Sequence, residues 1–142
     1  IKDLVEEFGS QSIVLSIEAK NIDGNNWEVY VENGREKTGI NVLNWVEEVN
    51  NLGAGEILLT SVDREGTRKG FDIDLIKKVQ SKINIPLIVS GGMGKLDHLE
   101  DVVKFANVDA VSMADILHYK RFSIMDIRNF ALSKNINVRV VN

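Results

Sequence analysis

Polar residues and glycines follow four short apolar runs of this chain, and they are the residues best placed to do chemistry. The runs cover residues 12–17, 55–60, 85–90 and 108–113. Continuous apolar runs of this length are typical of strands buried on both faces of a parallel sheet. In a barrel of such strands the active site lies at their carboxyl ends. The residues at those ends are Glu18, Thr60, Glu65, Gly66, Ser90, Gly91, Gly92, Ala114 and Asp115.

Carboxylates at strand ends fit acid–base chemistry. Glu18 ends an apolar run, where it can act as a general acid or base. An ion pair with Lys20 or with an arginine is the alternative, and residue type alone favours that pairing. Glu65 has two interpretations as well, because it stands in a charged stretch that is typical of a solvated loop. Glu56 begins its run, so we expect it at the opposite end of the sheet.

The run of Ser90, Gly91 and Gly92 fits phosphate binding. Glycines between a strand and a helix let a phosphate approach backbone N–H groups. A plain tight turn is the alternative interpretation of the same residues. A second phosphate contact in barrels comes from a short helix after the last strand. Residues 114–118 have that place in this sequence.

Helical patterns separate the apolar runs and predict the fold class. They cover residues 41–52, 72–82, 96–105 and 123–133, and residues 1–8 resemble the end of another helix. Repeated strand–helix units form either a doubly wound sheet or a (βα)8 TIM barrel. No dinucleotide fingerprint follows the first run, which argues against the open sheet. We therefore predict an α/β chain of four strand–helix units, or half a barrel, as one domain over residues 1–142.

The stretch between the first run and the first helical pattern is too long for an ordinary connection. Residues 27–31 alternate in polarity, and Asn33-Gly34 follows them. Alternation followed by Asn-Gly is typical of a β-hairpin. We expect a hairpin excursion over residues 25–38.

Composition excludes several classes of function. The formal net charge is −4, so the broad basic surface that nucleic acids require is missing. Cysteine is absent and only 2 histidines are present, so we expect no disulfide, no metal site and no cofactor. No segment resembles a membrane span or a signal peptide, so we expect a cytoplasmic protein without membrane contact. The sequence does not begin with Met, and we expect it to be a fragment.

Long segments of the chain closely resemble the cyclase subunit of imidazole glycerol phosphate synthase. The most specific match is residues 53–67, GAGEILLTSVDREGT, followed by residues 70–72, GFD, and 90–95, SGGMGK. The resemblance keeps its order and spacing through nearly all 142 residues. It corresponds to the C-terminal half of that family's barrel, strands five to eight. Further matching segments are 8–11, 19–20, 23–24, 38–39 and 137–139.

The resemblance implies a lyase of histidine biosynthesis. Enzymes of that family close an imidazole ring with ammonia from a glutamine amidotransferase partner. Their substrate is a bis-phosphorylated ribotide, and their products are imidazole glycerol phosphate and an aminoimidazole carboxamide ribotide. Glu18 matches a catalytic carboxylate, and Glu56 matches a charged gate where ammonia enters. Matches to substrate- and phosphate-binding positions are Thr60, Glu65, Gly66, Ser90, Gly91, Gly92 and Ala114.

Three positions depart from the family's pattern. Glu18 and Glu65 each replace an aspartate, and the longer side chain of Glu18 moves its carboxyl by roughly 1.5 Å. A misplacement on that scale can cost about 10²-fold in rate. Asp115 replaces a hydroxyl residue that holds phosphate, and its carboxylate would repel a phosphate dianion. The backbone N–H at this position would still serve if the Asp115 side chain turned away to cap the next helix.

These departures leave two other hypotheses open. One is a paralogue that passes ammonia from a glutaminase to a sugar amidotransferase in surface-polysaccharide biosynthesis, which the hairpin residues 27–30 and 33–38 resemble. In that role Glu56 would matter more than Glu18. The other is a non-catalytic half-barrel that self-associates, because its apolar edges need cover. We expect residues 1–142 alone to be inactive.

Overall fold

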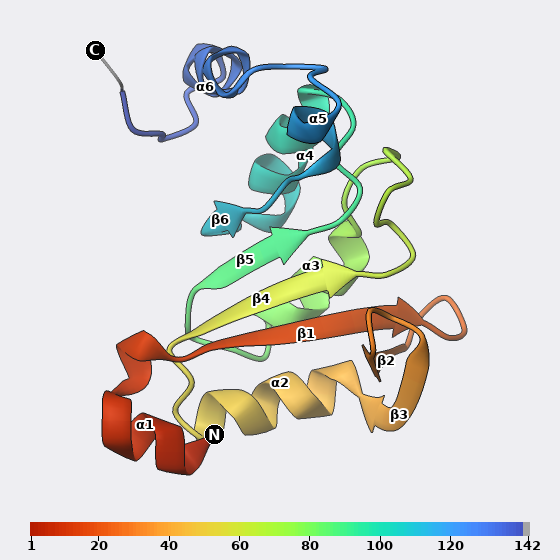
Figure 1. Ribbon diagram of the computed structural model, residues 1–142, viewed down its shortest axis with the longest axis vertical. Coiled ribbons are helices and arrows are strands. Elements are labelled where there is room, and N and C mark those ends of the chain that lie inside the picture. Colours follow the sequence, from red (N-terminus) through yellow and green to blue (C-terminus); the bar gives the residue numbers. More distant parts are fainter. Residues whose placement is uncertain (141–142) are drawn as a thin grey trace.

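The computed structural model describes residues 1–140 as an open six-stranded sheet with helices (Figure 1). The strands are β1 (Val14–Asn21), β2 (Trp27–Val31), β3 (Glu36–Asn41), β4 (Glu56–Ser61), β5 (Leu87–Ser90) and β6 (Ala110–Val111). Their order in the sheet is β3-β2-β1-β4-β5-β6. The strands β1, β4, β5 and β6 pair in parallel. Each of the four apolar runs therefore contains a parallel strand, which confirms the α/β class.

In the described residues, seven helical segments connect or flank the strands. They are α1 (Lys2–Phe8), η1 (Ser10–Ser12), α2 (Val42–Asn51), α3 (Ile73–Gln80), α4 (Asp97–Ala106), α5 (Asp115–His118) and α6 (Ile124–Ser133). In Figure 1, α1 lies near the amino-terminal ends of the central strands, whereas α5 follows β6 at the far end of the molecule. No helix in the described part of the chain is long and apolar enough to cross a membrane.

The two faces of the parallel sheet differ in burial. Ile17, Leu59 and Val89 point to one face and are buried there. They belong to one apolar cluster with buried residues of α2, α3 and α4. The alternate residues of the same strands are only half-buried, or exposed at the start of β1. The second face is therefore the open one, and polar residues on it can meet a ligand.

The expected hairpin is present as β2 and β3, and it extends the sheet beside β1. Both pairings are antiparallel, with Tyr30 opposite Glu18 and Lys37 opposite Tyr30. The indole of Trp27 is buried and donates to the Asp72 carboxylate at 3.1 Å. The strand β3 runs to Asn41, three residues beyond the expected end of the hairpin, because Asn41 still pairs with Glu28 of β2.

Side-chain caps define where three helices begin. Asn41 accepts from two amides of α2, and Asp72 accepts from the Leu75 amide of α3. Ser123 and Asp126 form a reciprocal capping box at the start of α6. Each cap satisfies backbone N–H groups that have no partner within the helix. The sequence patterns that begin at residues 41, 72 and 123 predict these three helix starts correctly.

The capping box of α6 predicts how the stability of the protein depends on pH. Hydrogen bonds from the backbone and the side chain of Ser123 lower the pKa of Asp126 below 3.8. A carboxylate with a lowered folded-state pKa stabilises the protein above its unfolded pKa, and that stability is lost as the pH falls through the folded pKa. We expect Ser123→Ala to move the pKa of Asp126 back toward 3.8, measured by NMR titration of the carboxyl carbon.

Asp23 provides the control for this titration. Its pKa is lowered mainly by the Asn26 side chain, with a further contribution from the Asn25 amide, far from α6 in the sequence. Ser123→Ala should leave the titration of Asp23 unchanged. An identical Asp126 titration in both proteins would contradict the role given to Ser123.

Candidate functional site

The register of the parallel strands brings three of the expected site residues into one row. Glu18 of β1 is paired with Thr60 of β4, and Thr60 is paired with Ser90 of β5. Paired residues of neighbouring strands lie about 4.8 Å apart and point to the same face of the sheet. All three are half-buried, on the open face. The row therefore offers a carboxylate and two hydroxyls to the same ligand.

Within residues 1–140, Glu18 accepts a backbone hydrogen bond and forms no ion pair. Its Oε2 lies 2.7 Å from the amide nitrogen of Gly34, in the turn between β2 and β3. That turn is unusual, because Glu32, Asn33 and Gly34 all have positive φ angles. Left-handed backbone at consecutive residues is costly for residues other than glycine. The Glu18 carboxylate is one of the contacts that hold the turn in place.

We expect the length of the Glu18 side chain to be needed for this contact. In Glu18→Asp the carboxyl retracts by roughly 1.5 Å, so the Gly34 amide should lose its acceptor and exchange with solvent faster. Amide hydrogen exchange measured by NMR would report the change.

Glu28 gives a matched comparison in the same hairpin. Its Oε1 accepts from the Gly39 amide at 2.6 Å. Glu28→Asp should accelerate exchange at Gly39 and leave Gly34 protected. If Gly34 stayed equally protected in Glu18→Asp, the turn would be held by other contacts.

A pocket of about 190 Å³ lies beside the row, between the loops that follow β4, β5 and β6. Its walls come from residues 65–68, 90–93 and 112–115, except Thr67. Seven of the expected residues contribute to it: Glu65, Gly66, Ser90, Gly91, Gly92, Ala114 and Asp115. Glu18 and Thr60 do not line it. The structure thus brings seven of the expected residues together in one pocket, and Ser90 belongs both to this pocket and to the row that contains Thr60 and Glu18.

Two glycines allow the loops around this pocket to approach each other. A Cβ on Gly91 would lie 2.8 Å from the Ser61 carbonyl oxygen, and one on Gly92 would collide with the Gly70 carbonyl. Both glycines have φ near +100°, which other residues avoid. The Gly70 amide also donates to the Gly92 carbonyl at 2.8 Å. Glycine is therefore required at both positions by backbone packing, whatever ligand the pocket takes.

Backbone N–H groups remain available at the pocket. Within residues 1–140, the amides of Gly91, Gly92 and Ala114 donate to no protein acceptor. Unpaired N–H groups from successive loop residues form concavities that suit anions. The pocket accordingly retains the donors that the phosphate interpretation requires.

Asp115 pairs with two arginines and does not cap α5. Its Oδ1 lies 3.3 Å from Nε of Arg121 and 3.4 Å from Nε of Arg68. No side chain caps the first turn of α5. The expectation that Asp115 could turn away to cap this helix is thus not fulfilled, because the two guanidinium groups hold its carboxylate instead.

Glu56 lies at the other end of β4, on the same face as Thr60. It is paired with Val14 at the start of β1 and is half-buried. Thr60 stands four positions further along the strand, which corresponds to about 13 Å. No side-chain hydrogen bond or ion pair of Glu56 is found among residues 1–140. Glu56 is thus separate from the row, as a residue at an entrance would be.

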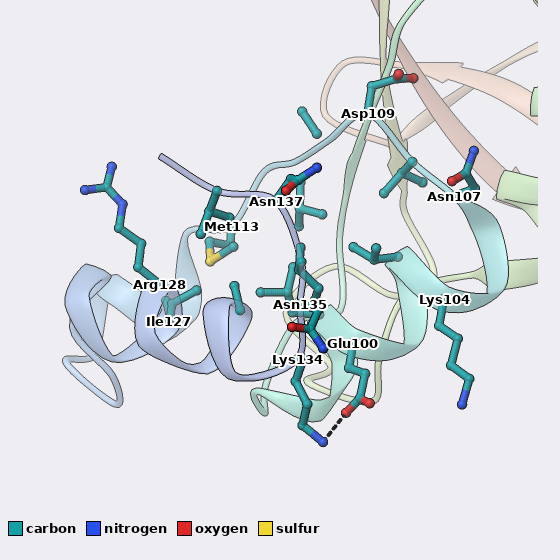
Figure 2. Close-up of a pocket in the computed structure, with 18 residues that line it drawn as sticks. Glu100, Lys104, Asn107, Asp109, Met113, Ile127, Arg128, Lys134, Asn135 and Asn137 are labelled. Atoms are coloured by element: carbon teal, nitrogen blue, oxygen red, sulfur yellow. Dashed lines mark ion pairs between the residues drawn. The ribbon is translucent and has the colours of Figure 1, made fainter. Parts of the chain in front are cut away.

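A groove of about 680 Å³ lies beside β6, away from the row (Figure 2). It runs between α4, β6, α6 and residues 134–138. Lys134 of the segment after α6 reaches across to Glu100 of α4, with Nζ and Oε2 2.7 Å apart. This ion pair raises the pKa of Lys134 above 10.5 through the hydrogen bond to Glu100. The groove is lined by apolar, amide and charged side chains and contains none of the expected site residues.

Two site features were missed by sequence reasoning. The contact of Glu18 with the Gly34 amide joins residues 16 positions apart, and Arg68 and Arg121 meet Asp115 across 47 and 6 positions. No spacing rule relates residues that far apart. The Asn-Gly pair was the only signal near the hairpin turn.

No three His, Cys, Asp or Glu side chains gather as a metal site in the described part of the chain.

A parallel α/β core, with glycine-rich loops and a carboxylate at the carboxyl edge of its strands, is typical of TIM-barrel-family domains. Sequence comparison agrees with this class. A family model described as histidine biosynthesis protein matches residues 1–123, and the chain belongs to this family.

One curated relative is a subunit of imidazole glycerol phosphate synthase, HisF, from Saccharolobus solfataricus. It is 43% identical over 140 residues, which is 99% of this chain and 55% of the relative. The resemblance described from the sequence is thereby confirmed, and the chain is HisF-like. It spans about 55% of the length of the relative it matches.

Proposed function

We propose that the protein containing this chain is the cyclase subunit of imidazole glycerol phosphate synthase in histidine biosynthesis. The observation that carries the proposal is the row of Glu18, Thr60 and Ser90 beside a pocket of free backbone N–H groups. The HisF-like sequence supports it. The substrate would be a bis-phosphorylated ribotide, and the chain would form the C-terminal half of the barrel.

Each expected site residue has a role in this proposal. Glu18 moves protons as ammonia adds to the substrate and the imidazole ring closes. Thr60, Glu65 and Gly66 line the substrate at the end of β4. One phosphate lies against the free amides of Gly91, Gly92 and Ala114, next to Ser90 and Asp115. No cofactor is needed, because addition of ammonia and ring closure are acid–base chemistry.

The contact between Glu18 and Gly34 limits this mechanism. A carboxylate that accepts a backbone hydrogen bond has one oxygen occupied. Its Oε1 remains free to take a proton from the attacking nitrogen and return it to a departing group. We propose that Glu18 works through Oε1 while Oε2 stays on the hairpin.

Ammonia would enter from a glutamine amidotransferase subunit, HisH-like, at the end of the sheet where Glu56 lies. Glu56 and Thr60 share one face of β4, so a path along that face leads from the entrance to the substrate. A charged residue at this position can control the passage of ammonia, because such a residue can form and break ion pairs.

The direct test is an ammonia-dependent cyclisation assay on the full-length protein, following loss of the ribotide chromophore at high ammonium. We expect turnover, and a 10²–10⁴-fold loss of kcat in Glu18→Gln, as removal of a general acid–base group causes. Glu28→Gln is the matched control, because Glu28 makes the same kind of contact within the hairpin. No turnover from folded, monodisperse protein would overturn the proposal.

A second function is favoured by the contact of Glu18 with Gly34, which occupies one oxygen of the carboxylate that a cyclase would use on its substrate. A paralogue that passes ammonia from a glutaminase to a sugar amidotransferase needs only the path. In that case Glu18→Ala keeps ammonia transfer intact, whereas Glu56→Ala uncouples the glutaminase from the acceptor. Equal losses in both variants would exclude the paralogue.

We propose that residues 1–142 alone are inactive and self-associate. The strand β6 pairs only with β5, so its outer edge is open within the described chain, beside the groove of Figure 2. Open strand edges and exposed apolar groups attract further chains. Light scattering on residues 1–142 should show dimers or larger species. A stable monomer at micromolar concentration would contradict this expectation.

A further inference from the structure

Two arginines from distant parts of the chain meet at one carboxylate oxygen. Arg68, in the loop after β4, and Arg121, after α5, both direct Nε at Oδ1 of Asp115. Arg68 and Asp115 line the pocket that holds the free amides of Gly91 and Gly92. Neither guanidinium donates an Nη hydrogen bond within residues 1–140. Both side chains thus have donors left over. Arg68 lines the pocket itself, and Arg121 contacts the pocket residue Asp115.

The backbone of Arg68 is held in an unfavourable conformation. Its φ is +60°, in the left-handed region that non-glycine residues seldom adopt. The loop packs so closely on Gly94 that a Cβ there would lie 2.7 Å from the Arg68 carbonyl oxygen. Such conformations persist where the surroundings enforce them, and they gather at functional sites. The close packing of the loop therefore fixes the backbone position from which the Arg68 side chain extends.

Arg121 is positioned by the end of α5. Lys120 has a φ of +51°, and the amides of Lys120 and Arg121 donate to the carbonyls of Leu117 and Ile116. This pair of bonds reverses the chain after the helix, as in a Schellman motif. The Arg121 guanidinium also lies 5.4 Å from the Tyr119 ring centre. Arg121 is thereby directed back toward Asp115.

We propose that Arg68 and Arg121 form a clamp for a phosphate monoester group bound at the Gly91–Gly92 amides. This inference rests on the proposed function, because it names the side chains that would hold one phosphate of that substrate. Planar guanidinium groups bind phosphate with two parallel hydrogen bonds, which lysine cannot do. Asp115 is a positioning residue, which holds both arginines while the pocket is empty.

Charge explains how Asp115 is compatible with phosphate. Asp115 alone would repel a dianion, but the two arginines outweigh its charge. A phosphate dianion attracts the guanidinium groups more strongly than the single charge of Asp115 does. Phosphate would therefore replace Asp115 as the partner of the two guanidinium groups.

The test is a titration of the full-length protein with inorganic phosphate, followed at the NMR signals of the Gly91 and Gly92 amides. These amides report on this pocket alone. We expect Arg68→Gln and Arg121→Gln each to weaken phosphate binding about tenfold or more, as loss of a charged hydrogen-bond donor does. Arg68→Lys should restore only part of the affinity. Asp115→Asn should tighten binding severalfold, because the competing charge is removed.

Lys120→Gln is the matched control, because it removes the same charge from an exposed neighbour of Arg121. It should leave the affinity within about twofold of the unmodified protein. Equal affinities in Lys120→Gln, Arg68→Gln and Arg121→Gln would overturn the clamp, as would phosphate binding only in Asp115→Asn.

These outcomes are independent of the cyclisation assay. If the protein cyclises its substrate and the arginine variants bind phosphate normally, the clamp fails and the proposed function stands. If phosphate binding depends on both arginines and no cyclisation occurs, the clamp stands and the proposed function fails.

Discussion

The parallel pairing of β1, β4 and β5 is the constraint on which the candidate site depends. It sets Glu18 beside Thr60 and Thr60 beside Ser90. A shift of one residue in either pairing would turn a polar side chain toward the apolar cluster and an aliphatic one toward the ligand face. Because Ile17, Leu59 and Val89 are almost fully buried, such a shift would expose a large apolar area. Burial of one face therefore fixes the positions of polar residues on the other.

The same sheet end is shaped by close contacts between loops. Gly91 and Gly92 let the turn after β5 press against the β4 loop, and Gly94 does the same for Arg68. These contacts are between backbone atoms, so any side chain at the three positions would push the loops apart. The shape of the pocket is consequently determined by backbone packing. The unpaired amides of its loops follow from that packing.

Much of this arrangement could be predicted from the sequence, because it depends on local patterns. Apolar runs predicted the parallel strands, and helical patterns that begin at residues 41, 72 and 123 predicted three helix starts. The contacts of Asp115 with Arg68 and of Glu18 with Gly34 could not be predicted in this way. Each depends on where two loops end in space, and several left-handed residues determine that. Charged and polar residues in such loops have many possible partners, and sequence alone does not choose among them.

The two departures from the family's pattern at Glu18 and Asp115 have one feature in common. In both, a carboxylate is satisfied by the chain itself, through the Gly34 amide or through two arginines. The longer side chain of glutamate at position 18 reaches the hairpin. The change from aspartate therefore links the carboxyl end of β1 to the turn between β2 and β3. A charge at position 115 is tolerated because Arg68 and Arg121 compensate it. The substitutions are therefore understandable as parts of a site whose loops are held by its own polar residues. A bound phosphate would replace the contacts of Asp115, whereas the contact of Glu18 with Gly34 would remain.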